Sequence, residues 1–79
     1  MKILMVCLGN ICRSPMAEGL MRAKIKKYQL DAEVDSAGFE AFHTGDAPDY
    51  RATQVMRQHG IDITSQQSRL FRKSDFETF

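Results

Sequence analysis

Residues 2–15 read KILMVCLGNICRSP, an apolar run followed by a short loop and a helix-starting pair. The run from Lys2 to Cys7 is bounded by Gly9-Asn10, which predicts a strand buried on both faces, as in a parallel sheet. A buried helix could contain the same run, but its short length and the turn dipeptide favour a strand. Ser14-Pro15 then predicts the start of a helix, with the Ser14 hydroxyl as a plausible N-cap.

The predicted first helix has an apolar face and a basic face. Its apolar residues recur at helical spacing: Ala17, Leu20, Met21, Ile25 and Tyr28. Its basic residues mostly occupy the rest of the surface: Arg22, Lys24, Lys26 and Lys27. We interpret the basic face as a solvated surface in preference to a docking surface.

The second part of the chain predicts a further strand and two helices. Residues 33–37 form a short strand that closes on Gly38, and the spacing favours a right-handed strand–helix–strand crossover. Asp46 is a candidate N-cap for a second helix, with Pro48 and Asp49 in its first turn and Gly60 as its stop. Its expected buried stripe is Ala52, Val55 and Met56. A short helix is predicted to start at Ser74.

Composition limits the size and class of the protein. Seventy-nine residues and 9.0 kDa correspond to one small domain or a piece of one. A formal net charge of +1 gives no overall field for nucleic acid or an anionic membrane, so we expect neither as a partner. No apolar run is long enough to span a bilayer, and two cysteines are a weak sign of secretion, so we expect a soluble cytoplasmic protein.

The loop between the first strand and the first helix is suited to bind an oxyanion. Successive backbone N–H groups can point inward as a nest, and the helix dipole adds partial positive charge. Arg13 adds a guanidinium that matches phosphate oxygens. Gly9 and Asn10 tolerate the backbone angles that such a tight loop requires. The pattern therefore predicts a site for a phosphate-like dianion.

Cys7 lies at the floor of this predicted site. The field that attracts phosphate should also lower the pKa of the Cys7 thiol and make the thiolate a nucleophile. Attack on a phosphate monoester would give a cysteinyl-phosphate, with Arg13 and the loop amides stabilising the transferring group. Ser14 could then donate a hydrogen bond to the sulfur as it leaves in the second step. This chemistry requires no metal or cofactor.

These residues carry a resemblance to a known family. The loop Cys7-Leu8-Gly9-Asn10-Ile11-Cys12-Arg13-Ser14-Pro15 resembles that of the low-molecular-weight protein tyrosine phosphatases. The similarity continues over the whole chain, through Asp35-Ser36-Ala37-Gly38, Pro48-Asp49-Tyr50-Arg51-Ala52, His59-Gly60-Ile61, Ser68-Arg69 and Asp75-Phe76. The resemblance implies that residues 1–79 are the N-terminal part of a single domain of this family. It implies hydrolysis of phosphotyrosine monoesters in proteins or peptides.

The same resemblance assigns roles to individual residues. It implies that Cys7 is the nucleophile and Arg13 the phosphate clamp, within a phosphate-binding loop that runs from residue 7 to residue 14. Asn10, Ser14 and Ser36 would support the loop by hydrogen bonds. The slot for the phenyl ring would be lined by Leu8, Ile11 and Phe42. Cys12 would be able to pair with an oxidised Cys7.

The sequence departs from the family pattern in two places. Gln66 stands where many relatives have a histidine that supports the loop, so protonation within the network should differ. The family's general acid is an aspartate in a downstream Asp-Pro pair, and no Asp-Pro pair occurs in residues 1–79. We assign this role to none of the aspartates present.

Three alternatives to tyrosine phosphatase activity stay open. An arsenate reductase would use the same loop but needs further cysteines, and none follows Cys12. A protein-arginine phosphatase typically has threonine in place of Ile11. The chain could also be a phosphate-binding fragment that lacks the general acid.

The expected fold is α/β, the N-terminal βαβα portion of a flavodoxin-like or Rossmann-like three-layer domain. We expect its short sheet to be completed by a second chain, by self-association or by further residues.

Overall fold

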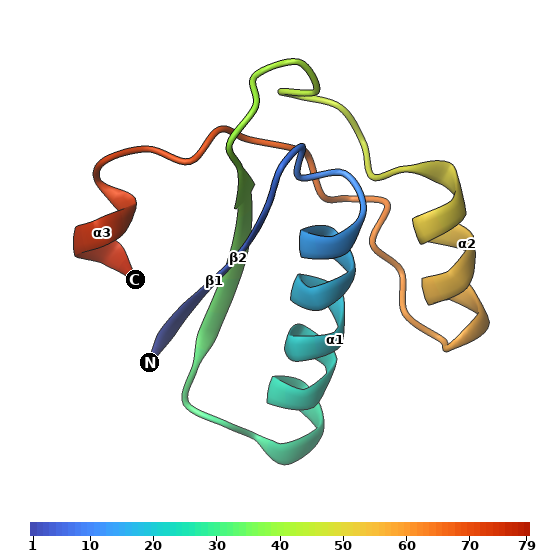
Figure 1. Cartoon of the computed structure of the whole chain (residues 1–79). Helices are drawn as coiled ribbons and strands as arrows, with labels where there is room; N and C mark the ends of the chain where they lie inside the picture. The colour runs from blue at the N-terminus through green and yellow to red at the C-terminus, as the bar shows by residue number, and fades with distance from the viewer.

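The computed structural model describes residues 1–79 and has five elements (Figure 1). They are β1 (Lys2–Cys7), α1 (Arg13–Tyr28), β2 (Glu33–Gly38), α2 (Tyr50–Gln58) and α3 (Asp75–Thr78). The α/β class and the predicted order of strands and helices are confirmed. No helix has the length and apolar character that crossing a membrane requires.

The two strands form a parallel sheet that brings their carboxyl ends together. The register runs from Lys2 opposite Glu33 to Cys7 opposite Gly38. A later segment extends the sheet at this end, because the Gly38 amide donates to the Arg69 carbonyl (2.9 Å) and the Phe71 amide donates to the Gly38 carbonyl (2.7 Å). The end of β2 is therefore hydrogen-bonded on both edges, to β1 at Cys7 and to residues 69–71 on the other edge.

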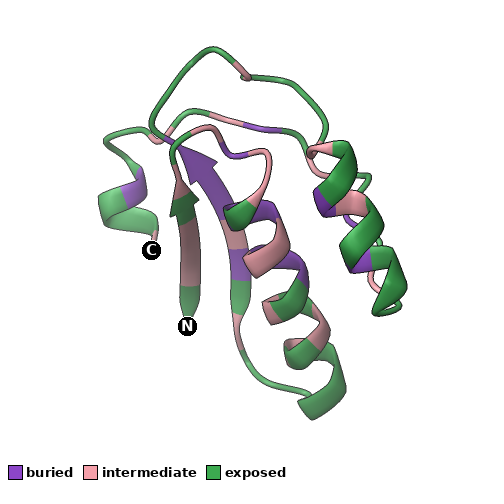
Figure 2. Ribbon diagram, turned by 45° about the vertical axis from the view of Figure 1, so that its right-hand side comes forward, coloured by how far each residue is buried: buried purple, intermediate pink, exposed green.

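The prediction that β1 is buried on both faces is wrong. Its residues are half-buried or exposed, and Val6 is 45% exposed. The buried residues gather on β2 instead, as Figure 2 shows. The reason is that β1 pairs with β2 alone, so its outer edge has no neighbouring strand in the sheet.

Two helix starts differ from prediction. Helix α1 begins at Arg13, with Cys12 at the N-cap, and the Ser14 hydroxyl makes no capping hydrogen bond because it bonds to Cys7 and Asn10 instead. Helix α2 begins at Tyr50, where the Asp49 carboxylate accepts hydrogen bonds from the second and third amides of the helix. The Asp46 carboxylate pairs with the His43 ring instead (3.2 Å). The predicted stop of α2 at Gly60 is confirmed, with a φ of 76° there, and Ser74 precedes α3 as predicted.

The buried face of α1 differs from prediction, whereas the predicted stripe of α2 is confirmed at Ala52 and Met56 and is wrong only at Val55. In α1 the fully buried residues are Ser14, Pro15, Glu18 and Gly19. Leu20 and Tyr28 are exposed, as is Val55 on α2. The core between the helices consists of Ala52, Met56 and Ile63, with Met16 and Ile61 packed against it.

Gly19 explains why this face of α1 is the buried one. A Cβ at Gly19 would lie 2.6 Å from Cγ2 of Ile63, so the helix can approach the 61–63 segment only because glycine is there. The prediction from apolar spacing selected the other face of α1, because Ser14, Glu18 and Gly19 are not apolar residues. The four residues of the basic face, Arg22, Lys24, Lys26 and Lys27, are all exposed.

Gly38 lies directly beneath the loop that follows β1, and we expect Gly38→Ala to displace this loop. A Cβ there would lie 2.9 Å from backbone atoms of Leu8, Gly9 and Asn10, none of which can turn away as a side chain could. We expect the free energy of unfolding, measured by chemical denaturation, to fall by about 1–3 kcal/mol. Orthophosphate binding should weaken as well.

Gly45→Ala is the matched control for this substitution. A Cβ at Gly45 meets nothing within 4 Å, so only the backbone cost of its φ of 87° applies. Equal stability and equal phosphate affinity of the two variants would contradict the role given to Gly38.

Candidate active site

Cys7 ends β1 and points its sulfur into the turn that leads to α1. The Ser14 hydroxyl oxygen lies 3.0 Å from Cys7 Sγ, and the backbone N–H of Asn10 donates to the same sulfur at 3.2 Å. Asn10 has a φ of 58°, a left-handed conformation that turns the loop back over the sulfur. The sulfur is therefore surrounded by hydrogen-bond donors.

The remaining loop donors have no backbone partner. The amides of Leu8, Gly9, Ile11 and Cys12 donate to no carbonyl of the chain. The loop ends at the N-terminus of α1, where N–H groups and the helix dipole favour an anion. Arg13, in the first turn of α1, is exposed and forms no salt bridge. A dianion in the loop would therefore meet amides that donate to no carbonyl and a guanidinium that has no carboxylate partner.

The two cysteines of the loop differ in acidity. Burial raises the pKa of Cys7, but hydrogen bonds from the Ser14 hydroxyl and from the amides of Ser14, Asn10 and Gly9 outweigh it, and the net pKa lies below its ordinary value. At Cys12, burial and the negative charge of Asp49 raise the pKa. Both thiols are unpaired. The structure thus makes Cys7 the more acidic of the two thiols.

Asn10 joins the loop to the rest of the fold. It is 2% exposed, and its Nδ2 donates to the hydroxyls of Ser14 (2.7 Å) and Ser36 (2.9 Å). Its Oδ1 accepts from the backbone N–H of Arg69 (2.9 Å). The three residues that the resemblance names as loop support are thus brought into one buried hydrogen-bonded group.

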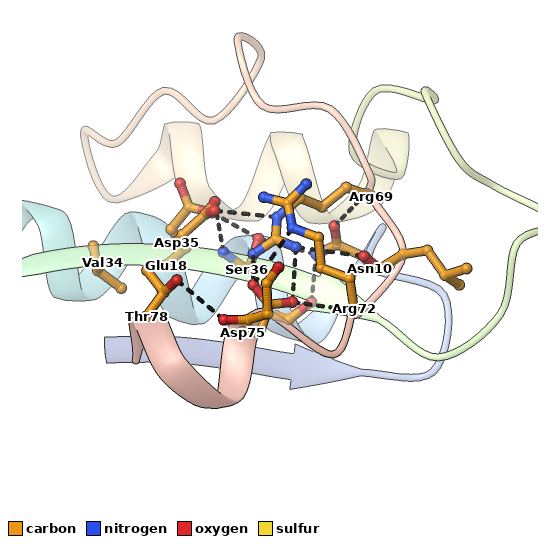
Figure 3. Close-up of polar contacts among 12 residues, drawn as sticks. Asn10, Glu18, Val34, Asp35, Ser36, Arg69, Arg72, Asp75 and Thr78 are labelled. Carbon is orange, nitrogen blue, oxygen red and sulfur yellow. Dashed lines mark hydrogen bonds and ion pairs between the residues drawn. The ribbon is translucent and has the colours of Figure 1, made fainter. Parts of the chain in front are cut away.

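Arg69 is a structural residue whose role sequence reasoning missed. Its Nε donates to Asp35 Oδ2 (3.1 Å), and its two terminal nitrogens form a bidentate pair with Asp75 (3.0 and 3.1 Å; Figure 3). The hydrogen bond from Arg69 and that from the Arg72 amide hold the pKa of Asp75 below its usual range. A spacing of six residues is not a helical pair, so the sequence contains no local signal for this clamp.

A shallow cavity of about 280 Å³ opens above Cys7. It is lined by Cys7, Leu8, Gly9, Ile11, Cys12, Arg13, Glu40 and His43. Phe42 is not part of the lining; it is 86% exposed and contacts the His43 ring edge-on, with 4.9 Å between centroids. Sequence reasoning missed Glu40 and His43 as neighbours of the site because an irregular loop offers no periodicity from which to place them.

The sequence pattern described as "Low molecular weight phosphotyrosine protein phosphatase" matches residues 2–79. The chain belongs to this family. It is 43% identical over 79 residues to the human low molecular weight phosphotyrosine protein phosphatase, covering 98% of this chain and 49% of the human protein. It is 44% identical over 81 residues to the Schizosaccharomyces pombe phosphatase of the same name, covering 99% and 51%.

Solved structures agree with this membership. YfkJ from Bacillus subtilis superposes with a TM-score of 0.96 at 37% identity, covering all of this chain and 51% of the other. A Drosophila arginine phosphatase superposes with a TM-score of 0.92 at 42% identity, covering 96% and 48%. The chain spans about half the length of the relatives that it matches.

Gln66, a predicted departure from the family pattern, lies against the start of α1. Its Nε2 donates to the Pro15 carbonyl (3.1 Å), and its Oε1 is buried without a hydrogen-bond partner. Gln66 forms no hydrogen bond with Asn10, Ser14 or Ser36. The loop group in this chain is therefore held without a side chain from this position.

Proposed function

We propose that residues 1–79 are the N-terminal part of one phosphatase domain that hydrolyses phosphotyrosine monoesters in proteins or peptides. The observation that carries the proposal is the placement of Cys7 Sγ, whose pKa is lowered, beneath loop amides and beside Arg13. The nucleophile and the candidate oxyanion donors line the same cavity, which supports phosphoryl transfer as the reaction.

The proposed reaction has two steps. In the first, the Cys7 thiolate attacks phosphorus, a P–S bond forms, the P–O bond to the tyrosine oxygen breaks, and that oxygen takes a proton from a general acid or from solvent. In the second, water attacks the cysteinyl-phosphate and gives up a proton to solvent, the P–S bond breaks, and orthophosphate and the thiolate are released. Arg13 and the amides of residues 8–14 stabilise the charge on the equatorial oxygens in both steps. No metal or cofactor enters this scheme.

The shape of the cavity supports an aromatic substrate. Leu8 and Ile11 contribute apolar surface to the cavity, and His43 also lines it. Phe42 lies against His43 and would extend this wall outward to meet the phenyl ring. A phenyl ring would pack against these apolar side chains, whereas phosphoserine has no ring to place there, so the lining favours phosphotyrosine.

Comparison of two substrates tests the proposal. The downstream aspartate that serves as general acid in this family is not among residues 1–79. An aryl phosphate with a good leaving group needs little protonation, so we expect it to be hydrolysed even where phosphotyrosyl peptide is hydrolysed slowly. Failure of both substrates, together with failure of orthophosphate to bind, would overturn the proposal. Binding without turnover of either would leave the phosphate-binding fragment as the better description.

A protein-arginine phosphatase is the second candidate. It is supported by the structural similarity to the Drosophila arginine phosphatase. Ile11 favours phosphotyrosine as the substrate, because the resemblance associates arginine phosphatases with threonine at this position. Faster hydrolysis of a phosphoarginyl peptide than of the matching phosphotyrosyl peptide would favour the second candidate.

The setting of the reaction is also part of the proposal. Two unpaired cysteines and a nucleophilic thiol suit a reducing cytoplasm. A net charge of +1 offers no general attraction for nucleic acid or membrane. The unpaired outer edge of β1 would accept another strand, from a second chain, from a second copy or from further residues of the same domain.

Ser14→Ala should affect the second step more than the first. Its hydroxyl lies 3.0 Å from Cys7 Sγ and would stabilise the sulfur as it leaves phosphorus. Loss of this donor should also raise the pKa of Cys7, since the hydroxyl is the strongest of the groups that lower it. We expect the dephosphorylation rate, measured by burst kinetics with an aryl phosphate, to fall by about tenfold or more. Equal slowing of both steps would contradict this role.

A further inference from the structure

Glu40 is the one carboxylate-bearing residue that lines the cavity above Cys7, and neither the proposed chemistry nor the family resemblance gives it a role. Its backbone N–H donates to the Leu8 carbonyl (2.9 Å), which fixes the main chain of Glu40 beside the loop that follows Cys7. Its side chain is exposed, and its carboxylate forms no ion pair. The cavity lining therefore includes a carboxylate that has no cationic partner.

The segment that carries Glu40 has no lysine or arginine of its own. Residues 39–49 connect β2 to α2 at the carboxyl end of the sheet, and they include three carboxylates (Figure 1). The carboxylate of Asp46 pairs with the His43 ring at 3.2 Å, and that of Asp49 accepts from amides in the first turn of α2. Glu40 is therefore the carboxylate of this segment that is left for a group from outside the chain.

Arg13 does not serve as the partner of Glu40. Both residues line the cavity, but they form no ion pair with each other. In the proposed reaction the Arg13 guanidinium binds the phosphate oxygens, and the phosphate dianion repels the Glu40 carboxylate. A cation supplied by another part of the substrate would offset this repulsion.

We propose that Glu40 is a specificity residue that binds a basic side chain close to phosphotyrosine, so that the preferred substrates are phosphotyrosyl peptides with a flanking lysine or arginine. An extended peptide advances about 3.4 Å per residue, so a residue one or two positions from phosphotyrosine stays near the rim of the cavity. An arginine there can form a bidentate pair with the Glu40 carboxylate, whereas a glutamate there is repelled. This inference rests on the proposed binding of phosphotyrosine above Cys7.

Peptide affinity tests the inference in a protein that cannot turn its substrate over. The Cys7→Ser protein is titrated in a calorimeter with matched phosphotyrosyl peptides that carry arginine, glutamine or glutamate at one of the two positions on either side of phosphotyrosine. We expect arginine at one or more of these positions to give about threefold to tenfold tighter binding than glutamate. Because Glu40 is exposed, this ratio should fall as the salt concentration rises.

Substitutions at Glu40 in the same protein identify the group that reads the flanking charge. Glu40→Gln conserves the shape and removes the charge, so we expect it to bring the arginine and glutamate peptides close to equal affinity. Glu40→Lys should make glutamate the preferred flanking residue. Both variants should fold as the parent protein does, because the Glu40 side chain is exposed and its hydrogen bond to Leu8 is made by the backbone.

Glu33→Gln is the matched control for these variants. Glu33 is an exposed glutamate that lies opposite Lys2 at the other end of β2, and it is not among the residues that line the cavity. Its substitution changes the overall charge as Glu40→Gln does, but it should leave the affinity ratio unchanged.

Equal affinities for the arginine and glutamate peptides at every position would overturn the inference. An arginine preference that persists in Glu40→Gln would overturn it as well, because another group would then be reading the flanking charge. The same holds if Glu33→Gln reduces the preference as much as Glu40→Gln does, since overall charge would then explain it.

Orthophosphate separates this inference from the proposed function. If orthophosphate displaces the phosphotyrosyl peptides but these show no preference for arginine, only the inference fails. If neither orthophosphate nor any of the peptides binds, the phosphate site fails, and the inference fails with it.

Discussion

Cys7→Ser should abolish turnover of an aryl phosphate while orthophosphate still binds. A serine hydroxyl stays protonated under conditions that ionise the Cys7 thiol, whose pKa is lowered by the donors around it. The loop amides and Arg13 stay in place, so the anion site survives without its nucleophile. We expect the rate to fall by about 10⁴-fold or more, measured at saturating substrate.

Cys12→Ser is the matched comparison for this variant. Cys12 lies in the same loop, at the N-cap of α1, and its thiol has a raised pKa. We therefore expect only its backbone N–H to bind phosphate. Its loss of rate should be far smaller than that of Cys7→Ser. A Cys7→Ser protein that retains turnover, or a Cys12→Ser protein that loses as much, would contradict the assignment of the nucleophile.

Arg13→Lys should lower turnover although the positive charge is conserved. The guanidinium of Arg13 can donate two parallel hydrogen bonds to phosphate oxygens, whereas an ammonium group acts as a point charge. We expect kcat to fall by about 10²-fold to 10³-fold, with a weaker affinity for orthophosphate. Steady-state kinetics and phosphate inhibition measure the two effects separately.

Arg57→Lys provides the control for this substitution. Arg57 is an exposed arginine in the last turn of α2 and is not among the residues that line the cavity above Cys7. It should leave both kcat and phosphate inhibition close to the wild-type values. Equal effects of the two substitutions would show that Arg13 acts through overall charge and not as a clamp.

The fold around Cys7 could be predicted because its signals are local. The apolar run, the glycine and the helix-starting pair follow one another along the chain, and the strand, loop and helix they predict are all present. The buried face of α1 could not be predicted in the same way. It carries Ser14 and Glu18, whose burial is satisfied by partners on β1, the loop and β2, and apolar periodicity cannot register such partners.

The residues that support the site likewise divide into those that local sequence predicts and those that depend on distant parts of the chain. Asn10 and Ser14 lie within the quoted stretch, so their proximity to Cys7 followed from spacing. The Arg69 amide reaches Asn10 from 59 residues away, and its position depends on a single bridge between β2 and Leu70. A contact of this kind has no pattern in the sequence, because Arg69 is held in place by Asp35 and Asp75, which are distant from Asn10 in the chain.

A crystal structure with orthovanadate tests most directly whether the loop holds a dianion over the Cys7 thiolate. We predict vanadium bonded to Cys7 Sγ, with its oxygens accepting hydrogen bonds from the amides of residues 8–14 and from the Arg13 guanidinium. Vanadate bound elsewhere, or centred away from the sulfur with the loop amides turned outward, would contradict the account.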